Sequence, residues 1–548
     1  MRTADLVLRN CNCLDPQHGK LFVPQDLFIV NGRIGSEESL KEKTTGDFDA
    51  GGRIVVPGGI FPSFRLPLNA NGLFKSRPGE TAKNLVSTGF TTVVVEGLTP
   101  FRALDMHRFL KKLPAVNKIP MIDVGNFQFM TGFLKNGIIN YASSLASLLL
   151  EKFKGFGISC LGPGTTTRWK SDLASPNVIF DQIPLVNASI EKIVSELTAV
   201  VSLENTRPAL LVETGIEGLP GSIESMERLL KELGTKDASG KRDKSRPAVA
   251  LKQLARAGHD QTNKGMNIEE HVSSVLKTLQ EHEDISGFTD LPGISSAESI
   301  FIDFSPSFLQ GSQDIVARGI IEGELFQCLF KARTIEKRGM LKSCWLSGMK
   351  MLLDMPETLK KRLSFSIMPQ IIQDTKEIIE SSSCLLNSKF RSSFMKAMKV
   401  DFPRNEIPHL FGDKVLSLPD YIHATRTAPA HILGLDDVLG GLAENQIGDV
   451  AILDASPRGL EDIISDPSKI RDLLGKPYAV IKNGNLVLKN GVFSPNIQGF
   501  TILRENKPDA SIINSIEENL EKQFLKYYST HENSKLVPEK MVEPVLVA

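Results

Sequence analysis

Cysteine and histidine supply the first candidates for chemistry in this sequence, because thiolate and imidazole groups are common ligands of transition metals. The chain contains six Cys and nine His, and among the cysteines only Cys11 and Cys13 lie close together. A single C-x-C pair is a weak indication of a metal site, so we predict six reduced thiols. His107 falls on a helical pattern after an apolar run, where we predict that it is solvated.

Charged residues that could approach the mouth of a barrel offer a second kind of chemistry, namely acid–base catalysis without a metal. Such a site needs two partners held at a fixed spacing, and the sequence offers no such pair. We therefore favour loop charges or ion pairs at strand ends, and a metal-free catalytic carboxylate remains the alternative. The residues concerned are Arg65, Glu96, Asp123, Lys154, Glu213 and Lys252.

Composition and length limit the classes of function. The chain has 548 residues, and its 64 Lys and Arg balance its 64 Asp and Glu, so the formal net charge is zero. Nucleic-acid-binding proteins usually carry a basic excess, which is missing here. The apolar run near Ile138–Leu150 is too short and too polar to cross a bilayer, and the first residues lack the pattern of a secretory signal. We therefore predict a cytoplasmic protein that binds neither nucleic acid nor membrane.

The middle of the chain, residues 57–414, predicts an α/β fold. Apolar runs such as Thr91–Val95 and Ala209–Val212 read as buried parallel strands, and helical patterns such as Ser189–Val200 and Ile223–Leu233 lie between such runs. Strands that alternate with helices over this length predict a (β/α)8 barrel of the TIM type. The mouth of such a barrel, at the carboxyl ends of the strands, is where any functional side chains should meet.

The two ends of the chain predict a second, smaller domain. Short apolar segments separated by Asn-Gly turns occupy residues 1–56 and again residues 415–503, and Asn-Gly between apolar runs is a strong hairpin signal. We predict that both ends together form one small β-sandwich. Residues 504–548 predict a C-terminal helix, within Ile512–Tyr527, followed by a mobile tail.

Three phrases, in order along the whole chain, carry a resemblance to the amidohydrolase superfamily. They are the opening strands that end in DLFIVNGRI, the phrase IVVPGGI, and Thr425–Asp454, which reads TRTAPAHILGLDDVLGGLAENQIGDVAILD. Two further segments, Lys75–Glu96 and Gly157–Lys170, are similar to the A subunits of formylmethanofuran dehydrogenase and of the bacterial formyltransferase/hydrolase complex. The resemblance implies hydrolysis of a formyl amide on a furan-type one-carbon carrier, with two zinc ions that activate water and polarise the carbonyl.

Six positions that match the ligand and base positions of this family lack the residue types that the chemistry needs. Ser63 and Arg65 stand at the two His of D-x-H-x-H, and Ser159 stands at the carboxylated Lys. Val212, Gln253 and Ile367 stand at the remaining His, His and Asp positions. Arg, Val and Ile cannot ligate zinc, and Ser has no amine to carboxylate. We therefore predict no catalytic residue, no metal ligand and no zinc cofactor.

Three functional hypotheses follow from this reading. The first is a catalytically inactive amidohydrolase-like subunit of a one-carbon formyl-transfer/hydrolase complex, with a structural or regulatory role and the other subunits as its partners. The second is an active hydrolase of a formyl amide or another C–N bond, with a rebuilt site. The third is a binding module that retains a furan-type one-carbon carrier in the old cavity.

Overall fold

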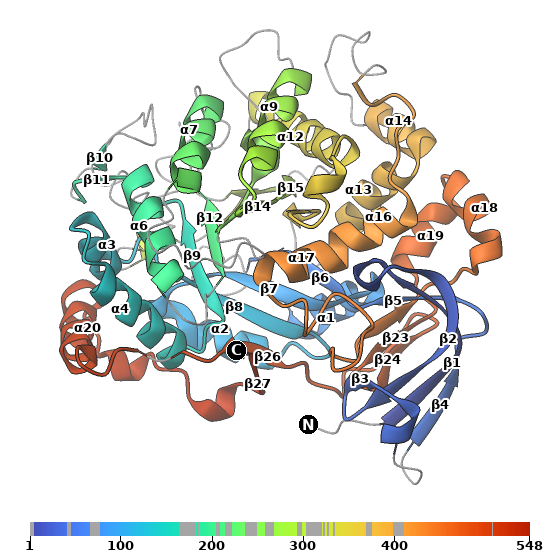
Figure 1. The fold of residues 1–548 in the computed structure, drawn as a ribbon, viewed down its shortest axis with the longest axis horizontal. Coiled ribbons are helices and arrows are strands. Elements are labelled where there is room, and N and C mark those ends of the chain that lie inside the picture. Colours follow the sequence, from blue (N-terminus) through green and yellow to red (C-terminus); the bar gives the residue numbers. More distant parts are fainter. Residues whose placement is uncertain are drawn as a thin grey trace.

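A barrel of alternating strands and helices forms the larger part of the molecule, and a second sheet lies beside it in the computed structural model (Figure 1). The residues that the structure describes are 5–40, 45–65, 77–163, 182–183, 186–203, 209–213, 222–235, 249–257, 268–292, 299–302, 320–321, 324–325, 328–331, 335–368, 375–397, 410–506 and 508–547.

Within the residues that the structure describes, the barrel contains eight parallel strands that pair in the order in which they occur along the chain. This arrangement confirms the predicted parallel barrel. The strand expected at Thr91–Val95 lies within β7, and the one expected at Ala209–Val212 corresponds to β12, which begins one residue later, at Leu210. In order, the strands are β6 (Gly59–Phe64), β7 (Phe90–Leu98), β8 (Asn117–Asp123), β9 (Gly157–Leu161), β12 (Leu210–Glu213), β13 (Val249–Leu251), β14 (Ile285–Phe288) and β20 (Leu363–Ser364).

Helices connect successive strands and cover the outside of the barrel (Figure 1). Their buried residues recur at helical spacing, as in α6, where Ile193, Val194 and Leu197 face the core. The helices predicted at Ser189–Val200 and Ile223–Leu233 are confirmed. The main helices are α1 (Pro78–Ser87), α2 (Ala103–Lys111), α3 (Gln128–Lys135), α4 (Ile139–Lys152), α6 (Ile190–Leu203), α7 (Ser222–Thr235), α9 (Ile268–Glu281), α12 (Ile335–Leu353), α13 (Lys376–Leu386) and α14 (Ser388–Ala397).

Alternation along the strands separates two apolar layers. In β7, Val93 and Val95 join the large core cluster between strands and helices, whereas Val94 joins a separate cluster inside the barrel. Residues of five further barrel strands lie in that inner cluster with Val94, because side chains two positions apart share one face of a strand. These inner residues include Ile60, Met121, Leu211, Ala250 and Phe288.

The barrel has a seam between its last and first strands. The hydrogen-bonded ladders run from β6 to β20, and none joins β20 to β6 among the residues that the structure describes. A π-helical turn, η5 (His423–Thr427), contacts both strands there. Beyond it, the short strand β21 (Ile367–Met368) contacts β6 and pairs with β15 (Leu291–Pro292).

In the described part of the chain, the second sheet has nine strands, and they come from both ends of the chain, as predicted. The joining pair is β5 and β22, where Val56 lies opposite Ala451. The predicted Asn-Gly turns are confirmed by positive φ angles at Asn31 and Gly32 and again at Asn483 and Gly484. The strands are β1 (Asp5–Asp15), β2 (Lys20–Val30), β3 (Arg33–Gly35), β4 (Thr45–Asp49), β5 (Ile54–Pro57), β22 (Val450–Ile452), β23 (Ala479–Lys482), β24 (Asn485–Lys489) and β25 (Val492–Phe493).

The C-terminal segment differs from the expected domain boundaries at two points. Strand β26 (Thr501–Arg504) pairs with β8 of the barrel sheet, and its Ile502 belongs to the apolar cluster inside the barrel. Residues expected to form a mobile tail contain β27 (Pro544–Val547), which is paired with β26. The predicted helix is confirmed as α20 (Ile513–Tyr528), which packs on α4.

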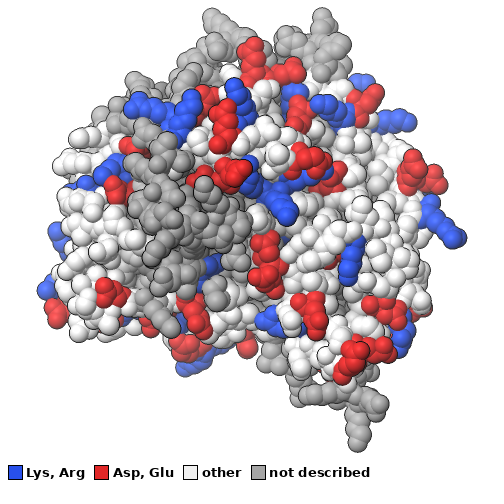
Figure 2. Space-filling view, in the orientation of Figure 1, with Lys and Arg blue, Asp and Glu red and all other residues white. Residues whose placement is uncertain are grey.

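The surface carries charges of both signs. On the face drawn in Figure 2, Lys and Arg are interspersed with Asp and Glu, in line with the zero net charge of the chain. In the described part of the chain, every helix is too short or too polar to span a bilayer.

Candidate functional site

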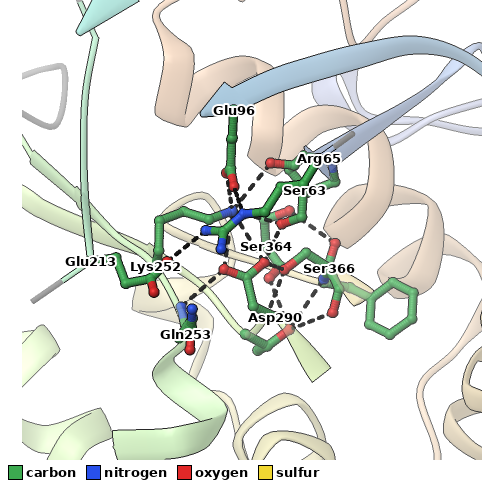
Figure 3. Close-up of polar contacts among 12 residues, drawn as sticks. Ser63, Arg65, Glu96, Glu213, Lys252, Gln253, Asp290, Ser364 and Ser366 are labelled. Atoms are coloured by element: carbon green, nitrogen blue, oxygen red, sulfur yellow. Dashed lines mark hydrogen bonds and ion pairs between the residues drawn. The ribbon is translucent and has the colours of Figure 1, made fainter. Parts of the chain in front are cut away.

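A polar layer lies directly above the apolar interior of the barrel, on the side of the mouth. Glu96, Glu213 and Lys252 each follow an inner apolar residue by two positions, so they extend the same face of their strands. Asp290 stands two residues after the inner Phe288. Strand β6 adds Ser63 from its end and Arg65 just beyond it, and Figure 3 shows these side chains converging.

Arg65 links three barrel strands. Its Nε donates to Oε2 of Glu96 at 2.5 Å, and its Nη2 donates to Oε2 of Glu213 at 2.6 Å. All three side chains are buried. A planar guanidinium suits this role, because it presents several donors at fixed angles to carboxylates on different elements.

Lys252 forms the second cationic centre and is fully buried. Its Nζ lies 2.7 Å from Oε1 of Glu96 and 3.0 Å from Oδ2 of Asp290. The same ammonium donates to Oγ of Ser63 at 2.7 Å and to the carbonyl of Pro62 at 3.1 Å. It also lies 4.3 Å from the centre of the Phe288 ring, where a cation is attracted to the aromatic face.

Asp290 accepts hydrogen bonds from three sides. The backbone N–H of Gln253 donates to its Oδ2 at 2.9 Å, and the hydroxyls of Ser63 and Ser366 both donate to its Oδ1. Burial alone would raise the pKa of Asp290. The charge of Lys252 and the hydrogen bonds from Ser366, Ser63 and Gln253 outweigh burial and hold that pKa below its ordinary value.

We call Arg65, Lys252, Glu96, Glu213 and Asp290, with Ser63 and Ser366, the ion network. It contains two cations and three carboxylates, and Glu96 bridges the two cations. Burying charges costs several kcal/mol per ion unless each is paired and hydrogen-bonded. The network meets this condition, because Arg65 and Lys252 each pair with two carboxylates, and Asp290 has donors on both oxygens.

The network does not fit a metal ion. Guanidinium and ammonium groups are donors only, and here they engage the carboxylates that would otherwise be available as ligands. Within the described residues, no group of three or more His, Cys, Asp or Glu side chains is placed to hold a metal. A divalent cation would have to displace Arg65 or Lys252 from their ion pairs.

The network also lacks an activated nucleophile. The hydroxyl of Ser63 contacts Lys252, and a Ser–Lys pair can be nucleophilic when the lysine is free to accept the proton. Here Lys252 serves as the cation of two ion pairs, and Ser63 donates its own proton to Asp290. The geometry therefore favours ion pairing by Lys252 over general base catalysis.

The six positions that match family ligands have different fates. Ser63 and Arg65 enter the ion network through their side chains, and Gln253 does so through its backbone N–H. Val212 and Ile367 instead belong to the core cluster between strands and helices. At those two strand ends, Glu213 and Ser366 are the residues that reach the network.

Ser159 lies on β9 and is fully buried, and its Oγ has no hydrogen-bond partner among the described residues. Its neighbour in register on β8 is Asp123, whose carboxylate accepts from the backbone N–H of Leu161 at 3.0 Å. Cys160 faces the outer core, where burial raises the pKa of its thiol. Each of these contacts suits a structural role.

Two residues of the ion network were not predicted from the sequence, and two candidate charges, Asp123 and Lys154, lie outside the network. Asp290 and Ser366 were not among the expected residues, although Asp290 follows the apolar strand β14 by two positions. That spacing after an inner residue is the signal that identifies it. Lys154 lies away from the network and pairs with Glu539 of the C-terminal segment.

Comparisons with known proteins find two relatives that align with this chain. No family model matches it. The chain is 22% identical to Protein FwdA of Methanocaldococcus jannaschii over 96% of its own length and 95% of that protein. It is 25% identical to the A subunit of the formyltransferase/hydrolase complex Fhc of Methylorubrum extorquens over 40% of its length and 43% of that protein. The chain is homologous to both proteins.

A solved structure has the same fold. A chain of the formyltransferase/hydrolase complex FhcABCD of Methylorubrum extorquens, crystallised with methylofuran, superposes with a TM-score of 0.75. The match covers 99% of this chain and 100% of that one, at 17% identity. This likeness extends over both the barrel and the second sheet.

Proposed function

From this homology we propose that the chain is the counterpart of FwdA, or of the Fhc A subunit, in a cytoplasmic complex that transfers or hydrolyses one-carbon formyl groups. We propose further that it does not catalyse the hydrolysis itself and has a structural or regulatory role. Homology to FwdA and to the Fhc A subunit supports the type of subunit. The observation that carries the lack of catalysis is the occupation of the polar layer by Arg65 and Lys252.

The chemical argument rests on what hydrolysis of an amide needs. A nucleophile must be generated near neutral pH, and the developing negative charge on the carbonyl oxygen must be stabilised. In this chain the carboxylates are engaged by internal cations, and the one candidate hydroxyl donates to Asp290. The chain thus keeps the fold of its homologues, but its ion network offers neither a free nucleophile nor a group to stabilise the oxyanion. A role in assembly needs the fold and does not need these groups.

Co-purification from the native host tests the type of subunit. We expect the tagged chain to be recovered with homologues of the other subunits of FhcABCD, at fixed stoichiometry by native mass spectrometry. Arg108→Met, which removes an exposed charge from α2, serves as a control that leaves assembly unchanged. A chain that behaves as a monomer without these subunits would contradict the proposal.

Turnover tests the lack of catalysis. We expect the purified chain, with and without added zinc, to leave a formylated furan carrier intact, whereas the Fhc A subunit assayed in parallel is the reference. Formyl hydrolysis that does not co-elute with the chain in size-exclusion chromatography would point to contamination. Hydrolysis that depends on the chain itself would favour the second candidate below.

The second candidate is an active hydrolase of a formyl amide or another C–N bond with a rebuilt site. The contact between Ser63 Oγ and Lys252 Nζ, at 2.7 Å, is the observation in its favour. Under this mechanism Ser63→Ala would abolish turnover while leaving the fold intact. Retention of any activity in that variant would exclude Ser63 as the nucleophile.

A third candidate is a module that binds a furan-type one-carbon carrier without turning it over. The related FhcABCD complex was crystallised with methylofuran, which makes that compound the probe of choice. Carrier binding would raise the melting temperature of the chain in proportion to ligand concentration. An unchanged melting temperature at saturating methylofuran would leave a purely structural or regulatory role.

A further inference from the structure

We propose that the ion network is the device that closes the barrel, tying the first strand to the far edge of the sheet where the backbone ladder is interrupted. The proposal concerns folding, and it does not depend on whether the chain works in a complex. It gives Arg65 and Lys252 a structural role. Their charged side chains hold the strand ends together, where the resemblance implies metal ions.

The lower half of the seam is filled by backbone. The carbonyl of Ala424, in η5, accepts from the backbone N–H of Phe365 at 3.1 Å and from Oγ of Ser364 at 3.0 Å. Arg426 of the same turn donates from Nε to the carbonyl of Pro57 at 3.4 Å, just before β6 begins. The inserted turn thus contacts both edges where they do not pair with each other.

The upper half of the seam, at the mouth, is bridged by side chains. Ser63 belongs to β6 and Ser366 follows β20, and both hydroxyls donate to the same oxygen of Asp290. Asp290 therefore joins the two edge strands from its place after β14 (Figure 3). The backbone N–H of Asp290 in turn donates to Oγ of Ser366 at 2.7 Å, which fixes this bridge from both sides.

The two cations extend the bridge around the mouth. Lys252 reaches β6 through the Pro62 carbonyl, β7 through Glu96, and the end of β14 through Asp290. Arg65 joins the end of β6 to β7 and β12. Each cation thus connects carboxylates from different strands, and Asp290 loses its compensating charge if Lys252 is removed.

Hydrogen–deuterium exchange of the full chain tests this inference, because it shows which strands exchange faster when the network is broken. Lys252→Met keeps the length of the side chain but leaves Glu96 and Asp290 without a shared cation. We expect amide exchange in Gly59–Phe64 and in residues 363–368 to accelerate on the order of tenfold or more, because local opening of the seam becomes easier. Exchange in β1, β2 and β23 should remain as in the wild type.

A second buried lysine provides the matched control. Lys482 is fully buried and pairs with Asp449 in the second sheet, so Lys482→Met breaks an ion pair of the same kind elsewhere. We expect this variant to accelerate exchange around β22 and β23 and to leave the seam unchanged. Acceleration of the seam by Lys482→Met, or uniform acceleration by Lys252→Met, would overturn the proposal.

Ser366→Ala covers the case in which Lys252→Met does not fold. This change removes one hydroxyl bridge to Asp290 and keeps all four ion pairs of the network. We expect faster exchange confined to the seam, smaller than for Lys252→Met. Unchanged exchange there would refute the bridge, while co-purification and turnover would still test the proposed function separately.

Discussion

At the scale of single residues, Arg65 sets the charge balance at the barrel mouth. A neutral side chain at this position would leave Glu96 and Glu213 near each other without the cation that both now contact. Because these carboxylates are buried, solvent can do little to compensate. The Arg65 cation therefore makes the burial of these two carboxylates tolerable.

Replacing Arg65 should consequently be costly. We expect Arg65→Met to lower the free energy of unfolding by about 3–5 kcal/mol, because breaking a buried ion pair strands the remaining charge. Urea denaturation measures this change. Arg108→Met, which removes an exposed ion pair of α2, should cost less than about 1 kcal/mol.

The partner of Arg65 offers a stricter check. In the double variant Arg65→Met with Glu213→Gln, one stranded charge disappears, so part of the lost stability should return. Equal stability of the single and double variants would contradict coupling between these two residues.

His107 illustrates a residue whose environment was predicted incorrectly. The expectation of a solvated side chain is wrong, because His107 is buried on α2 and its Nε2 donates to the carbonyl of Phe153 at 3.1 Å. Burial disfavours the charged imidazolium and lowers the pKa of His107 to about 4. Its neutral form is therefore part of the folded core.

This burial predicts a dependence of stability on acid. The unfolded chain binds a proton at His107 with an ordinary pKa near 6.5, and the folded chain does so only near 4. Stability is therefore complete above about pH 6.5 and falls as the pH decreases toward 4. At pH 5 the loss from this residue should be about 2 kcal/mol.

Urea denaturation at pH 7.5 and pH 5 measures this loss. His107→Gln retains a donor for the carbonyl of Phe153 but cannot take up the proton, so its stability should fall less between the two pH values. An identical fall in variant and wild type would show that His107 does not contribute.

At the scale of elements, helix α20 joins the C-terminal segment to the barrel. Phe524 is fully buried, and its ring lies 6.1 Å from that of Phe153 and 6.5 Å from that of Phe127. Lys152, at the end of α4, pairs with Glu517 of α20 and with Glu532, which follows α20. These contacts make the C-terminal segment part of the folded molecule.

Substitutions at two neighbouring residues of α20 test whether the helix is docked on the barrel. Phe524 is the buried test position, and Leu525 is the exposed control. We expect Phe524→Ala to lower the free energy of unfolding by about 3–5 kcal/mol, because a buried aromatic leaves a cavity. Leu525 is 42% exposed, and Leu525→Ala should change stability by less than about 0.5 kcal/mol. Equal effects of the two changes would mean that α20 is not docked as described.

At the scale of the whole molecule, the filled polar layer predicts indifference to metal. A ligand stabilises a protein only if it binds the folded state, so a chain without a metal site gains nothing from zinc. We expect the melting temperature to be the same in millimolar EDTA and in micromolar zinc. A chelator-sensitive melting temperature would show that the fold holds a metal after all.

Local patterns were sufficient to predict much of this architecture. The apolar run Thr91–Val95, the helical pattern of Ser189–Val200 and the Asn31-Gly32 turn each depend on neighbouring residues, and all three are present in the structure. The ion network was harder to predict, because a shift of one residue in a strand exchanges the side chains that face inward and outward. Val212 matches a ligand position of the family but faces the outer core, and its neighbour Glu213 is the residue that points inward.

Contacts between distant segments explain the remaining differences. The pairing of β26 with β8 and of β27 with β26 depends on backbone partners that lie far apart in the sequence, and no local pattern specifies them. The burial of His107 likewise depends on Phe153, which belongs to another element. Sequence patterns identified which segments form strands and helices, but not these particular pairings.

The second sheet has a consequence for how the protein is made. Strand β5 finds its partner β22 only after roughly 390 further residues have been added, since Pro57 lies opposite Val450. At ribosomal rates of 5–20 residues per second, the wait is about 20–80 s. During synthesis the first five strands therefore expose an open edge, a site where nascent chains can pair wrongly with one another. Chaperone protection of the growing N-terminal strands is the natural requirement of a domain that is begun first and completed last.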